Sequence, residues 1–455
     1  MNNQEKEYYL PKHDLSDHES HPWFENKIYP QLLYKHNRED HDLISVSDET
    51  MGCIMHYLYF DGRYNKLSDN ACKLFIKNHL PEQYRHPKHW EQVMKELNTD
   101  APDISMNELD GDEAIINFKN GLYNISTREL MPHSPDIYSS VQLPCNNDTS
   151  LTLRDAPIFS RFLNDITSGD DDLKILIMQY IGAIVSNVNG YRFKRLLILF
   201  GMGNTGETQI RGLVEKILGK EHCHSESLQV LNARFGTSQI YGKRMVGSGE
   251  LSAVRLDEMN IIKELTGGDD MNGEQKGKDG FSFKFRGLLW FNCNQLPKFK
   301  GDRGPHVYER FLIVPCTNVI PKEKQDANIL EKMYEERDAI VNVAVKLLQR
   351  AIFAGYKFTE GVAVKRARRE YEYQNNSLCE FIKSECDLTL GSTKRSEFNK
   401  AYFQWCRDNS LPAEQLKDIG DILRDVYGIT PKKSGEVCYD LSIKSYQLNY
   451  LSSLR

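Results

Sequence analysis

The residues best suited to chemistry lie in one glycine-rich stretch, Gly201-Met-Gly-Asn-Thr-Gly-Glu-Thr208. It matches the phosphate-binding pattern G-x-x-x-x-G-K-[ST] at Gly201, Gly206 and Thr208. Glycines allow the backbone to wrap a phosphate with its N–H groups, and the N-terminus of a following helix adds positive potential. The Thr208 hydroxyl stands where such loops bind Mg²⁺. The stretch therefore predicts a loop that holds nucleotide phosphates.

Glu207 breaks this pattern, because it stands where the pattern requires lysine. A lysine at this position pairs with the β- and γ-phosphates. A carboxylate has the opposite sign: at about 4 Å and an effective dielectric constant near 20, its contact with a phosphate costs on the order of 4 kcal/mol. A glycine-rich turn before a helix, without any nucleotide, is the alternative from this stretch alone.

Three polar residues further along the chain could complete a catalytic site around those phosphates. Glu250 ends a predicted short strand, where an acid holds the Mg²⁺ water or polarises the attacking water, and we assign it both roles. Asn294 follows a buried apolar run and could hydrogen-bond the attacking water or the γ-phosphate. Arg310 precedes another apolar run, where an arginine can reach a neighbouring subunit's site. Taken singly, each residue is better explained as structural.

A basic segment follows Glu250 in the sequence. Two glycine-rich turns surround Lys276 and Lys278, and the aromatic run 281–285 comes directly after them. This arrangement predicts a hairpin with a basic tip, which suits contact with nucleic-acid phosphates. An exposed charged hairpin without function is the alternative.

The elements that must position these residues are those of an α/β core. The apolar run 196–200 predicts a strand that leads into the glycine-rich loop, and an amphipathic helix follows it. Two helices over 159–188 would form a helical collar, and the apolar spacing predicts one long helix over 328–354. The charged segment 364–373 predicts a helical linker.

The N-terminal part predicts a mixed α+β domain. Residues 1–20 are polar and predict an arm, and the patterns over 23–97 predict helices. Residues 114–125 alternate like strands, with a turn at Asn120-Gly121. A polar break then marks a domain boundary near residue 150.

The C-terminal part predicts three helices followed by a β-hairpin. The helices are expected at 377–386, 395–408 and 414–427, and the hairpin turn carries Lys432 and Lys433. Three helices and a basic wing describe a winged-helix DNA-binding domain, and a small protein-interaction domain is the alternative. The predicted divisions are an N-terminal domain (1–150), a core with its collar (151–360), a linker (361–376) and this module (377–455).

The composition narrows the class of protein. The net charge is −6 and the pI about 6.1, so any DNA contact would come from local basic patches. The ten cysteines form no C-x-x-C pair, which predicts a reduced protein without a zinc site. No run of about 18 apolar residues occurs and MNNQEKEYYL is no signal peptide, so we expect a cytoplasmic protein without a membrane segment.

The order of these features resembles that of the superfamily III helicases, the hexameric helicases of small DNA viruses and of poxvirus-type, phage and plasmid primase-helicases. GMGNTGET is similar to their motif A and KRMVGSGE to their motif B. LTGGDDMNGEQKGKDGFSFKFRGLLWFNCNQLP resembles their hairpin and sensor motifs, and EAIINFKNGLYNISTRELMPHSPDIYSSVQLP resembles the domain before the helicase in the poxvirus and phage branch. The layout is most similar to the replication initiator-helicases (Rep) of staphylococcal pathogenicity islands and cassette elements.

This resemblance implies an AAA+-like ATPase with ATP and Mg²⁺ bound between the subunits of a homo-hexamer. Glu250 would act as the base, Asn294 as the sensor, and Arg310 would reach in from the neighbouring subunit; Lys194 would lie near that interface. Thr208 and Glu250 would contact the metal. The residues that would hold the nucleotide are Gly201, Gly203, Asn204, Thr205, Gly206, Glu207 and Thr208.

The resemblance also implies two kinds of DNA contact. Lys276 and Lys278 would line a central pore around single-stranded DNA, along which the helicase would move 3′ to 5′. The C-terminal module, with Lys432 and Lys433, would bind duplex origin DNA and make the protein a replication initiator of a mobile genetic element.

Glu207 is the departure from the family pattern. It is the change that an experimenter would choose to stop hydrolysis, so we interpret the chain as an engineered, hydrolysis-deficient form of an active helicase. A naturally inactive paralogue is the second interpretation. The competing function is a non-enzymatic origin-binding or scaffold protein that keeps the helicase fold. An AAA+ regulator or packaging ATPase would not require the basic hairpin and the winged helix together.

Overall fold

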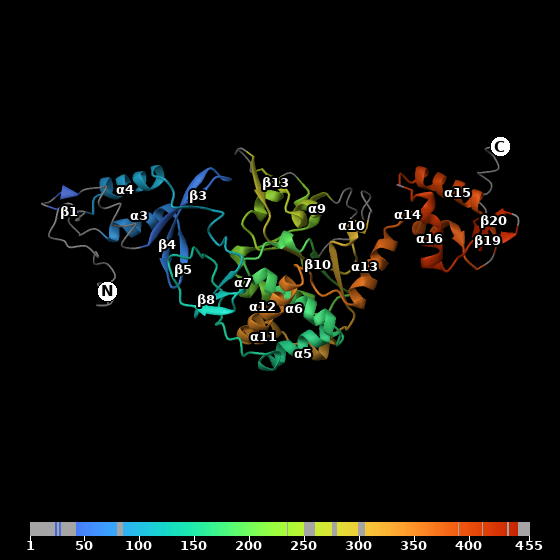
Figure 1. Cartoon of the computed structure of the whole chain (residues 1–455), viewed down its shortest axis with the longest axis horizontal. Helices are drawn as coiled ribbons and strands as arrows, with labels where there is room; N and C mark the ends of the chain where they lie inside the picture. The colour runs from blue at the N-terminus through green and yellow to red at the C-terminus, as the bar shows by residue number, and fades with distance from the viewer. Residues whose placement is uncertain are drawn as a thin grey trace.

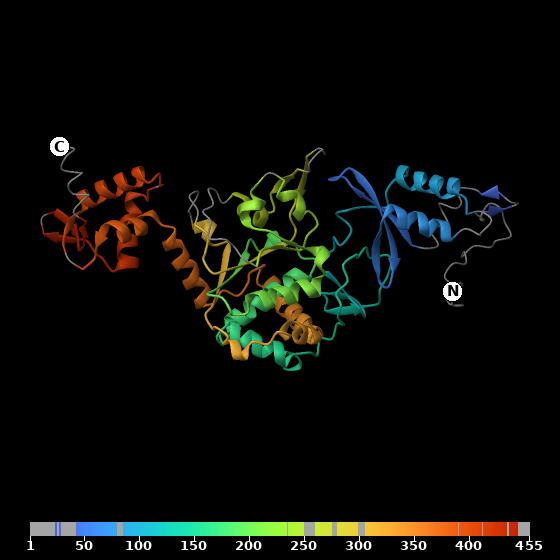
Figure 2. The same ribbon diagram turned by 180° about the vertical axis from the view of Figure 1, so that it is seen from behind.

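The chain forms three parts that follow one another in sequence and in space (Figures 1 and 2). A central part surrounds a parallel sheet, with an N-terminal part on one side and a C-terminal module on the other. The computed structural model describes residues 23–24, 27–28, 42–79, 85–233, 235–249, 260–274, 280–298, 305–389, 391–411, 413–434 and 436–444.

The central sheet has five parallel strands in the order β11-β12-β15-β10-β16. Their bounds are β10 Leu196–Gly201, β11 Cys223–Ser225, β12 Met245–Gly247, β15 Leu288–Cys293 and β16 Phe311–Cys316. Leu197 and Leu199 of β10 join one hydrophobic cluster, whereas Leu196 and Ile198 join another. The strand is apolar on both faces because both faces of a parallel sheet are covered. The strand predicted before the glycine-rich loop is therefore confirmed, in the interior of the sheet.

Helices and a hairpin cover the two faces of this sheet. One face packs against α5 Pro157–Ile166, α6 Asp171–Val185, α7 Glu207–Leu218, α11 Ile329–Glu335 and α12 Arg337–Phe353. The other packs against α8 Leu228–Leu231, α9 Asn260–Gly267, β13 Asp270–Gly273, β14 Phe281–Lys284, α10 Pro305–Tyr308 and α13 Val362–Gln374. Short 3-10 helices lie at Leu153–Asp155, Gly190–Arg192, Lys220–His222, Thr237–Ile240 and Lys322–Lys324. The two helices predicted over 159–188, the hairpin and the helix after the loop are confirmed as elements.

The prediction of one long helix over 328–354 is wrong, because α11 and α12 are separate helices that meet at Glu336. The Glu336 carboxylate accepts hydrogen bonds from the backbone N–H groups of Ile158 (3.0 Å) and Phe159 (2.8 Å). These N–H groups lie in the first turn of α5, which has no side-chain cap of its own. The apolar spacing continues across the break, so periodicity alone could not reveal it.

The helical prediction for 23–97 is wrong at 23–24 and 27–28, which form two short paired strands, and over 43–67, which forms three antiparallel strands. They are β3 Leu43–Asp48, β4 Cys53–Phe60 and β5 Arg63–Leu67, in a sheet of order β5-β4-β3-β6 with β6 Ile104–Ser105. The helices are α3 Asp69–Asn78 and α4 Pro87–Thr99, and β1 Trp23–Phe24 pairs with β2 Lys27–Ile28. The turn at Asp61-Gly62 between aromatic residues was a hairpin signal that favoured strands.

A second antiparallel sheet, β7-β8-β9, connects the N-terminal part to the collar. Its strands are β7 Ile115–Phe118, β8 Gly121–Asn124 and β9 Glu129–Met131, and the predicted turn at Asn120-Gly121 is confirmed. Ile116, Phe118 and Tyr123 belong to the same hydrophobic cluster as α6 and α12. Residues before 150 therefore contribute both to a core of their own and to the core of the central part.

The C-terminal module has its own hydrophobic cluster. Its elements are α14 Ser377–Glu385, β17 Cys386–Asp387, β18 Thr393–Lys394, α15 Arg395–Asp408, α16 Leu416–Tyr427, β19 Lys432–Ser434, β20 Glu436–Tyr439 and β21 Ser442–Ile443. The three helices and the hairpin are at their predicted positions. The helix predicted over 364–373 is also confirmed as part of α13, where Tyr371 is buried against β16 and donates to Pro297 O (2.6 Å).

Candidate nucleotide-binding site

The glycine-rich loop leaves β10 at the carboxyl end of the sheet and turns directly into α7. Gly203 (φ 90°), Asn204 (φ 57°) and Gly206 (φ 97°) adopt the left-handed conformation, which glycine and asparagine adopt most readily. In the described part of the chain, the N–H groups of residues 203–206 donate to no backbone acceptor. Asn204 O accepts from Ile320 N (2.8 Å), which fixes the loop from outside. The loop thus presents free N–H groups at a helix N-terminus, the arrangement that binds phosphate.

Asn294 lies beside this loop. β15 pairs in parallel with β10, and Cys293 is opposite Phe200, so the next residue on each strand brings Asn294 next to Gly201. Neighbouring strands are about 4.8 Å apart. Asn294 is exposed, and no hydrogen bond holds its side chain within the described residues. It is therefore positioned to contact a ligand in the loop.

The side chain of Glu207 folds back toward the sheet. The residue is only 8% exposed, and a Cβ atom built on Gly201 would collide with Glu207 Oε1. Burial, and secondarily the Glu207 charge, raise the pKa of the Cys293 thiol to about 12. The same causes raise the pKa of Cys316, which is at the end of β16. The carboxylate therefore lies between the loop and the ends of three strands.

Several buried polar atoms around the loop have no hydrogen-bond partner among the described residues. They are Thr205 Oγ1, Glu207 Oε1 and Asn292 Nδ2, on residues that are 0%, 8% and 3% exposed. Buried polar groups in proteins are normally paired, and an orphaned group costs about 1–3 kcal/mol. A cluster of three such groups at one edge of a sheet is the pattern of a site that is completed by a ligand.

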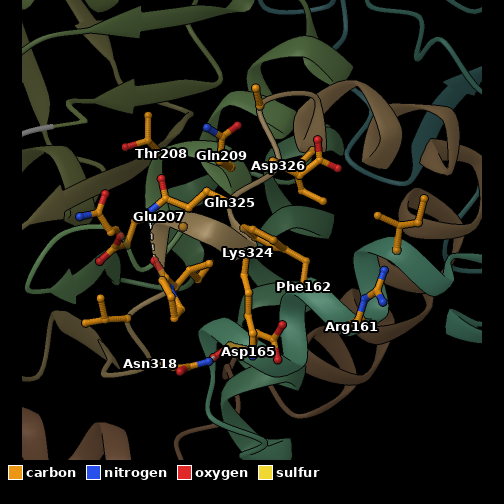
Figure 3. A pocket seen from close by; sticks show the side chains of 18 residues that line it. Arg161, Phe162, Asp165, Glu207, Thr208, Gln209, Asn318, Lys324, Gln325 and Asp326 are labelled. Atoms are coloured by element: carbon orange, nitrogen blue, oxygen red, sulfur yellow. Dashed lines mark hydrogen bonds between the residues drawn. The ribbon is translucent and has the colours of Figure 1, made fainter.

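A cavity of about 720 Å³ opens in front of the loop (Figure 3). Loop residues, α5 and the segment after β16 form its walls, with apolar contacts from Phe162, Val319 and Ile320. Figure 3 shows Glu207 and Thr208 at one end, Arg161 at the other and Lys324 between them. Drug-sized ligands occupy cavities of roughly 300–1,000 Å³, so the space suits a nucleotide whose base contacts the apolar wall.

Arg310 lies at the opposite edge of the sheet. Its carbonyl accepts from Leu196 N (2.8 Å), at the amino end of β10, and six residues of strand, about 20 Å, separate it from the loop. Its Nη1 donates to Thr266 Oγ1 (2.6 Å), and burial lowers the pKa of its guanidinium. The structure therefore does not bring Arg310 to the loop of its own chain. Lys194 is exposed at the same amino edge.

Several predicted residues lie outside the described part of the chain. Glu250 is one of them, although the preceding strand β12 ends beside β15 as expected. Lys276 and Lys278, which lie between β13 and β14 in the sequence, are also outside the described residues.

The predicted DNA-contacting lysines of the C-terminal module are on β19. Lys432 is exposed and its Nζ pairs with Asp440 Oδ2 (2.5 Å); the structure describes only the backbone of Lys433. The third helix of the module, α16, carries two basic and three acidic residues, and its Arg424 pairs with Asp421 (2.8 Å) and Asp425 (2.9 Å). This helix therefore presents no excess of positive charge.

Arg211 is a residue of this site that sequence reasoning missed. It is 6% exposed on α7, its Nη2 donates to Gly247 O (3.0 Å), and it pairs with Glu215 (2.9 Å). It therefore ties the helix after the loop to the end of β12, just before Glu250. A single arginine in an amphipathic helix is usually solvated, so nothing in the sequence indicated that Arg211 is buried.

The described residues contain no group of histidine, cysteine and carboxylate side chains that could hold a metal ion. They also contain no helix with the length and apolar character needed to cross a membrane.

Two family profiles match the chain. Residues 25–168 match a family described as D5 N terminal like, and residues 199–310 match a family of unknown function (DUF5906). The second match starts within β10 and ends at Arg310, so it contains the loop, the hairpin and Asn294. Neither match covers half of the chain.

Similar proteins include viral relatives. "Putative helicase 121R" of Invertebrate iridescent virus 3 is 26% identical over 244 residues, which is 50% of this chain and 25% of that protein. "Putative helicase 184R" of Invertebrate iridescent virus 6 is 24% identical over 251 residues, 51% of this chain and 25% of that protein. The chain thus spans about a quarter of the length of these relatives. Among solved structures, the apo A form of the NrS-1 C-terminal region covers 91% of this chain and 99% of its own, with 13% identity and a TM-score of 0.45.

Proposed function

We propose that this chain is the motor of a replication helicase of the viral and phage primase-helicase type, in a form whose ATP hydrolysis is impaired. The observation that carries the proposal is the loop after β10, whose free N–H groups lie beside Asn294 at the carboxyl edge of the sheet. In open α/β sheets, ligands bind at this edge where the strand order reverses. In this sheet, the chain passes from β10 to β11 and β12 on one side of β10. From β15 it passes to β16 on the other side of β10.

The backbone of the site fits ATP and Mg²⁺, whereas one side chain opposes them. Gly203, Gly206 and the first turn of α7 would hold the phosphates, and the exposed Thr208 hydroxyl would contact Mg²⁺. The Glu207 carboxylate, folded back behind the loop, would put a negative charge next to the phosphates where a lysine would neutralise them. Bound ATP would supply the free energy for movement along DNA. We therefore expect weak nucleotide binding and turnover near background.

The position of Arg310 supports assembly, because it can reach a nucleotide only in a neighbouring copy of the chain. We propose a homo-hexamer with ATP at each interface, Glu250 as the base, Asn294 as the sensor and Arg310 supplied by the neighbour. Lys276 and Lys278, which follow β13 in the sequence, would contact single-stranded DNA in the pore. The C-terminal module would add origin recognition for a mobile genetic element.

The test is a side-by-side comparison of this chain with Glu207→Lys and Glu207→Gln. We expect DNA-stimulated ATPase activity and unwinding of a forked duplex from Glu207→Lys only, because glutamine removes the repulsion without supplying a cation. A Glu207→Lys, Asn294→Ala double variant controls for nonspecific effects and should be inactive. If Glu207→Lys is inert and yet binds DNA, the helicase proposal is wrong and an origin-binding scaffold takes its place.

The initiator role has a separate test, in which the chain binds labelled duplexes of candidate origin sequence or scrambled sequence at matched salt. Specific proteins bind their sites at least about 10³-fold more tightly than other DNA. The balanced charge of α16 and the Lys432–Asp440 pair argue for weak phosphate attraction at this module. Equal affinity for both duplexes would count against origin recognition.

A further inference from the structure

A basic groove lies far from the glycine-rich loop, between the β8–β9 turn and the outer face of α12. We define it by Arg128 on the turn and Lys346 and Arg350 on the helix. Two adjoining cavities of about 340 and 580 Å³ share Arg128 and Asn147 in their walls. The β7–β9 sheet and α12 lie side by side in both views (Figures 1 and 2).

The charges of the basic groove are not balanced by acids. The smaller cavity has no acidic residue in its wall, and the larger has only Asp148, whose Oδ1 accepts from Ser150 N (2.9 Å). Within the described residues, Arg128, Lys346 and Arg350 form no ion pair. Lys346 and Arg350 are four residues apart on one helix, where like charges destabilise the helix by about 0.2–0.5 kcal/mol. An anionic ligand would relieve this repulsion.

The groove is held in place by hydrogen bonds that leave its cations free. Gln349 Nε2, between the two helix cations, donates to Tyr123 Oη (3.1 Å) and Ile125 O (2.9 Å). Arg128 N donates to Asn124 O (2.8 Å), which closes the turn that presents Arg128. The three cations are therefore brought together by folding and not by sequence proximity.

An exposed aromatic ring completes the groove. Phe353, in the last turn of α12, is 68% exposed, and the Arg128 guanidinium lies 5.6 Å from its ring centre. Proteins that bind single-stranded nucleic acids combine a positive groove, which follows the phosphates, with exposed aromatic rings on which bases stack. Both components are present here: the cations are on the β8–β9 turn and α12, and the aromatic ring of Phe353 is on α12.

We propose that this groove binds single-stranded nucleic acid, with phosphates on Arg128, Lys346 and Arg350 and a base stacked on Phe353. This proposal rests on the proposed function in one respect, which is that a helicase encounters single-stranded nucleic acid. The groove lies on the collar side of the molecule, away from the β13–β14 hairpin, and would hold the strand before or after the pore.

The test measures binding of a fluorescein-labelled oligo-dT by anisotropy, without nucleotide, across a range of salt concentrations. The variant Arg128→Ala, Lys346→Ala, Arg350→Ala should lose affinity on the order of 100-fold at 50 mM salt, and the slope of log K against log salt should fall by about 2. Phe353→Ala should lose about tenfold and Phe353→Trp little, since tryptophan retains a stacking surface.

The matched control removes three lysines elsewhere, with Lys73→Ala, Lys88→Ala and Lys95→Ala on α3 and α4. Equal affinities of the groove and control variants would overturn the proposal and leave the helicase function intact. An original chain that binds no strand would contradict both. Displacement of the strand by pyrophosphate alone, with no dependence on strand length, would instead assign a site for small phosphates. A changed oligomeric state of Phe353→Ala with unchanged affinity would assign the ring to a subunit contact.

Discussion

The central sheet has a carboxyl edge, where its parallel strands end, and an amino edge, where they begin. The two edges differ in the polar groups that a ligand or partner could contact. At the carboxyl edge, Thr205 Oγ1, Glu207 Oε1, Asn292 Nδ2 and the N–H groups of residues 203–206 find no hydrogen-bond partner in the described part of the chain. At the amino edge, Arg310 is anchored by Thr266 and leaves its Nε unpaired. The carboxyl edge therefore has the features of a ligand site, whereas the amino edge holds a partly buried arginine. In the proposed homo-hexamer, the amino edge of each chain would meet the carboxyl edge of the next copy.

The largest expected effect tests the amino edge. In the Glu207→Lys background, Arg310→Ala should lower ATP turnover by about 10³-fold or more, as for other arginine fingers supplied in trans, and leave nucleotide affinity nearly unchanged. Thr266→Val removes only the anchor of Arg310 and should have a smaller effect. Single-stranded-DNA-stimulated ATPase measurements check both.

A mixing experiment sharpens this prediction. The original chain has an intact Arg310 with a defective loop, whereas Glu207→Lys, Arg310→Ala has the reverse defect. Mixing these two inactive chains should restore turnover at interfaces where the repaired loop faces an intact Arg310. If mixing restores nothing, or if Glu207→Lys, Arg310→Ala is fully active by itself, the two edges do not meet in the way we propose.

The next effect concerns the carboxyl edge alone. Replacing Glu207 with glutamine removes a negative charge beside the proposed phosphate-binding loop, and we expect ATP affinity to rise by at least about tenfold. Lysine should raise it by about tenfold more. Isothermal titration calorimetry of the three chains measures the steps. Thr208→Ala in the lysine background should reverse part of the gain in the presence of Mg²⁺. Affinities that do not depend on residue 207 would place the nucleotide elsewhere.

The sequence predicted the carboxyl edge better than the amino edge. Gly201, Gly206 and Asn294 stand in local patterns, a strand followed by a turn, that fix their position at one end of a parallel sheet. The separation of Arg310 from the loop depends on strand order, which no local pattern encodes. The buried Glu207 carboxylate and the tie from Arg211 to Gly247 depend on side-chain packing and could not be read from spacing.

A third prediction concerns the wall of the carboxyl-edge cavity. Glu336 supplies the missing cap of α5, the helix that contributes Arg161 and Phe162 to that wall. Glu336→Ala should lower the free energy of unfolding by about 1–2 kcal/mol, since two N–H groups lose their acceptor. Urea unfolding followed by circular dichroism measures this. The matched substitution Glu335→Ala, one residue earlier, should cost less than about 0.5 kcal/mol; equal costs would contradict the capping role.

The last prediction reports the direction of the Glu207 side chain. Burial and the Glu207 charge raise the pKa of Cys293 to about 12 in the folded chain, above the usual thiol value of about 8.5 in the unfolded chain. The folded state thus keeps a proton that the unfolded state releases, so the stability from this thiol is complete below about pH 8.5 and is lost as the pH rises toward 12.

Cys293→Ala should therefore make the alkaline loss of stability shallower, by up to about 1.4 kcal/mol per pH unit above pH 9. Urea unfolding between pH 7.5 and 10.5 measures the free energy of unfolding of the variant and of the original chain. The contributions of the other titrating groups cancel in the difference between the two chains. Glu207→Gln removes the second cause of the shift, so alkylation of Cys293 by iodoacetamide at pH 10 should become faster. An unchanged alkylation rate would mean that the carboxylate points away from the strand ends, toward the phosphate position.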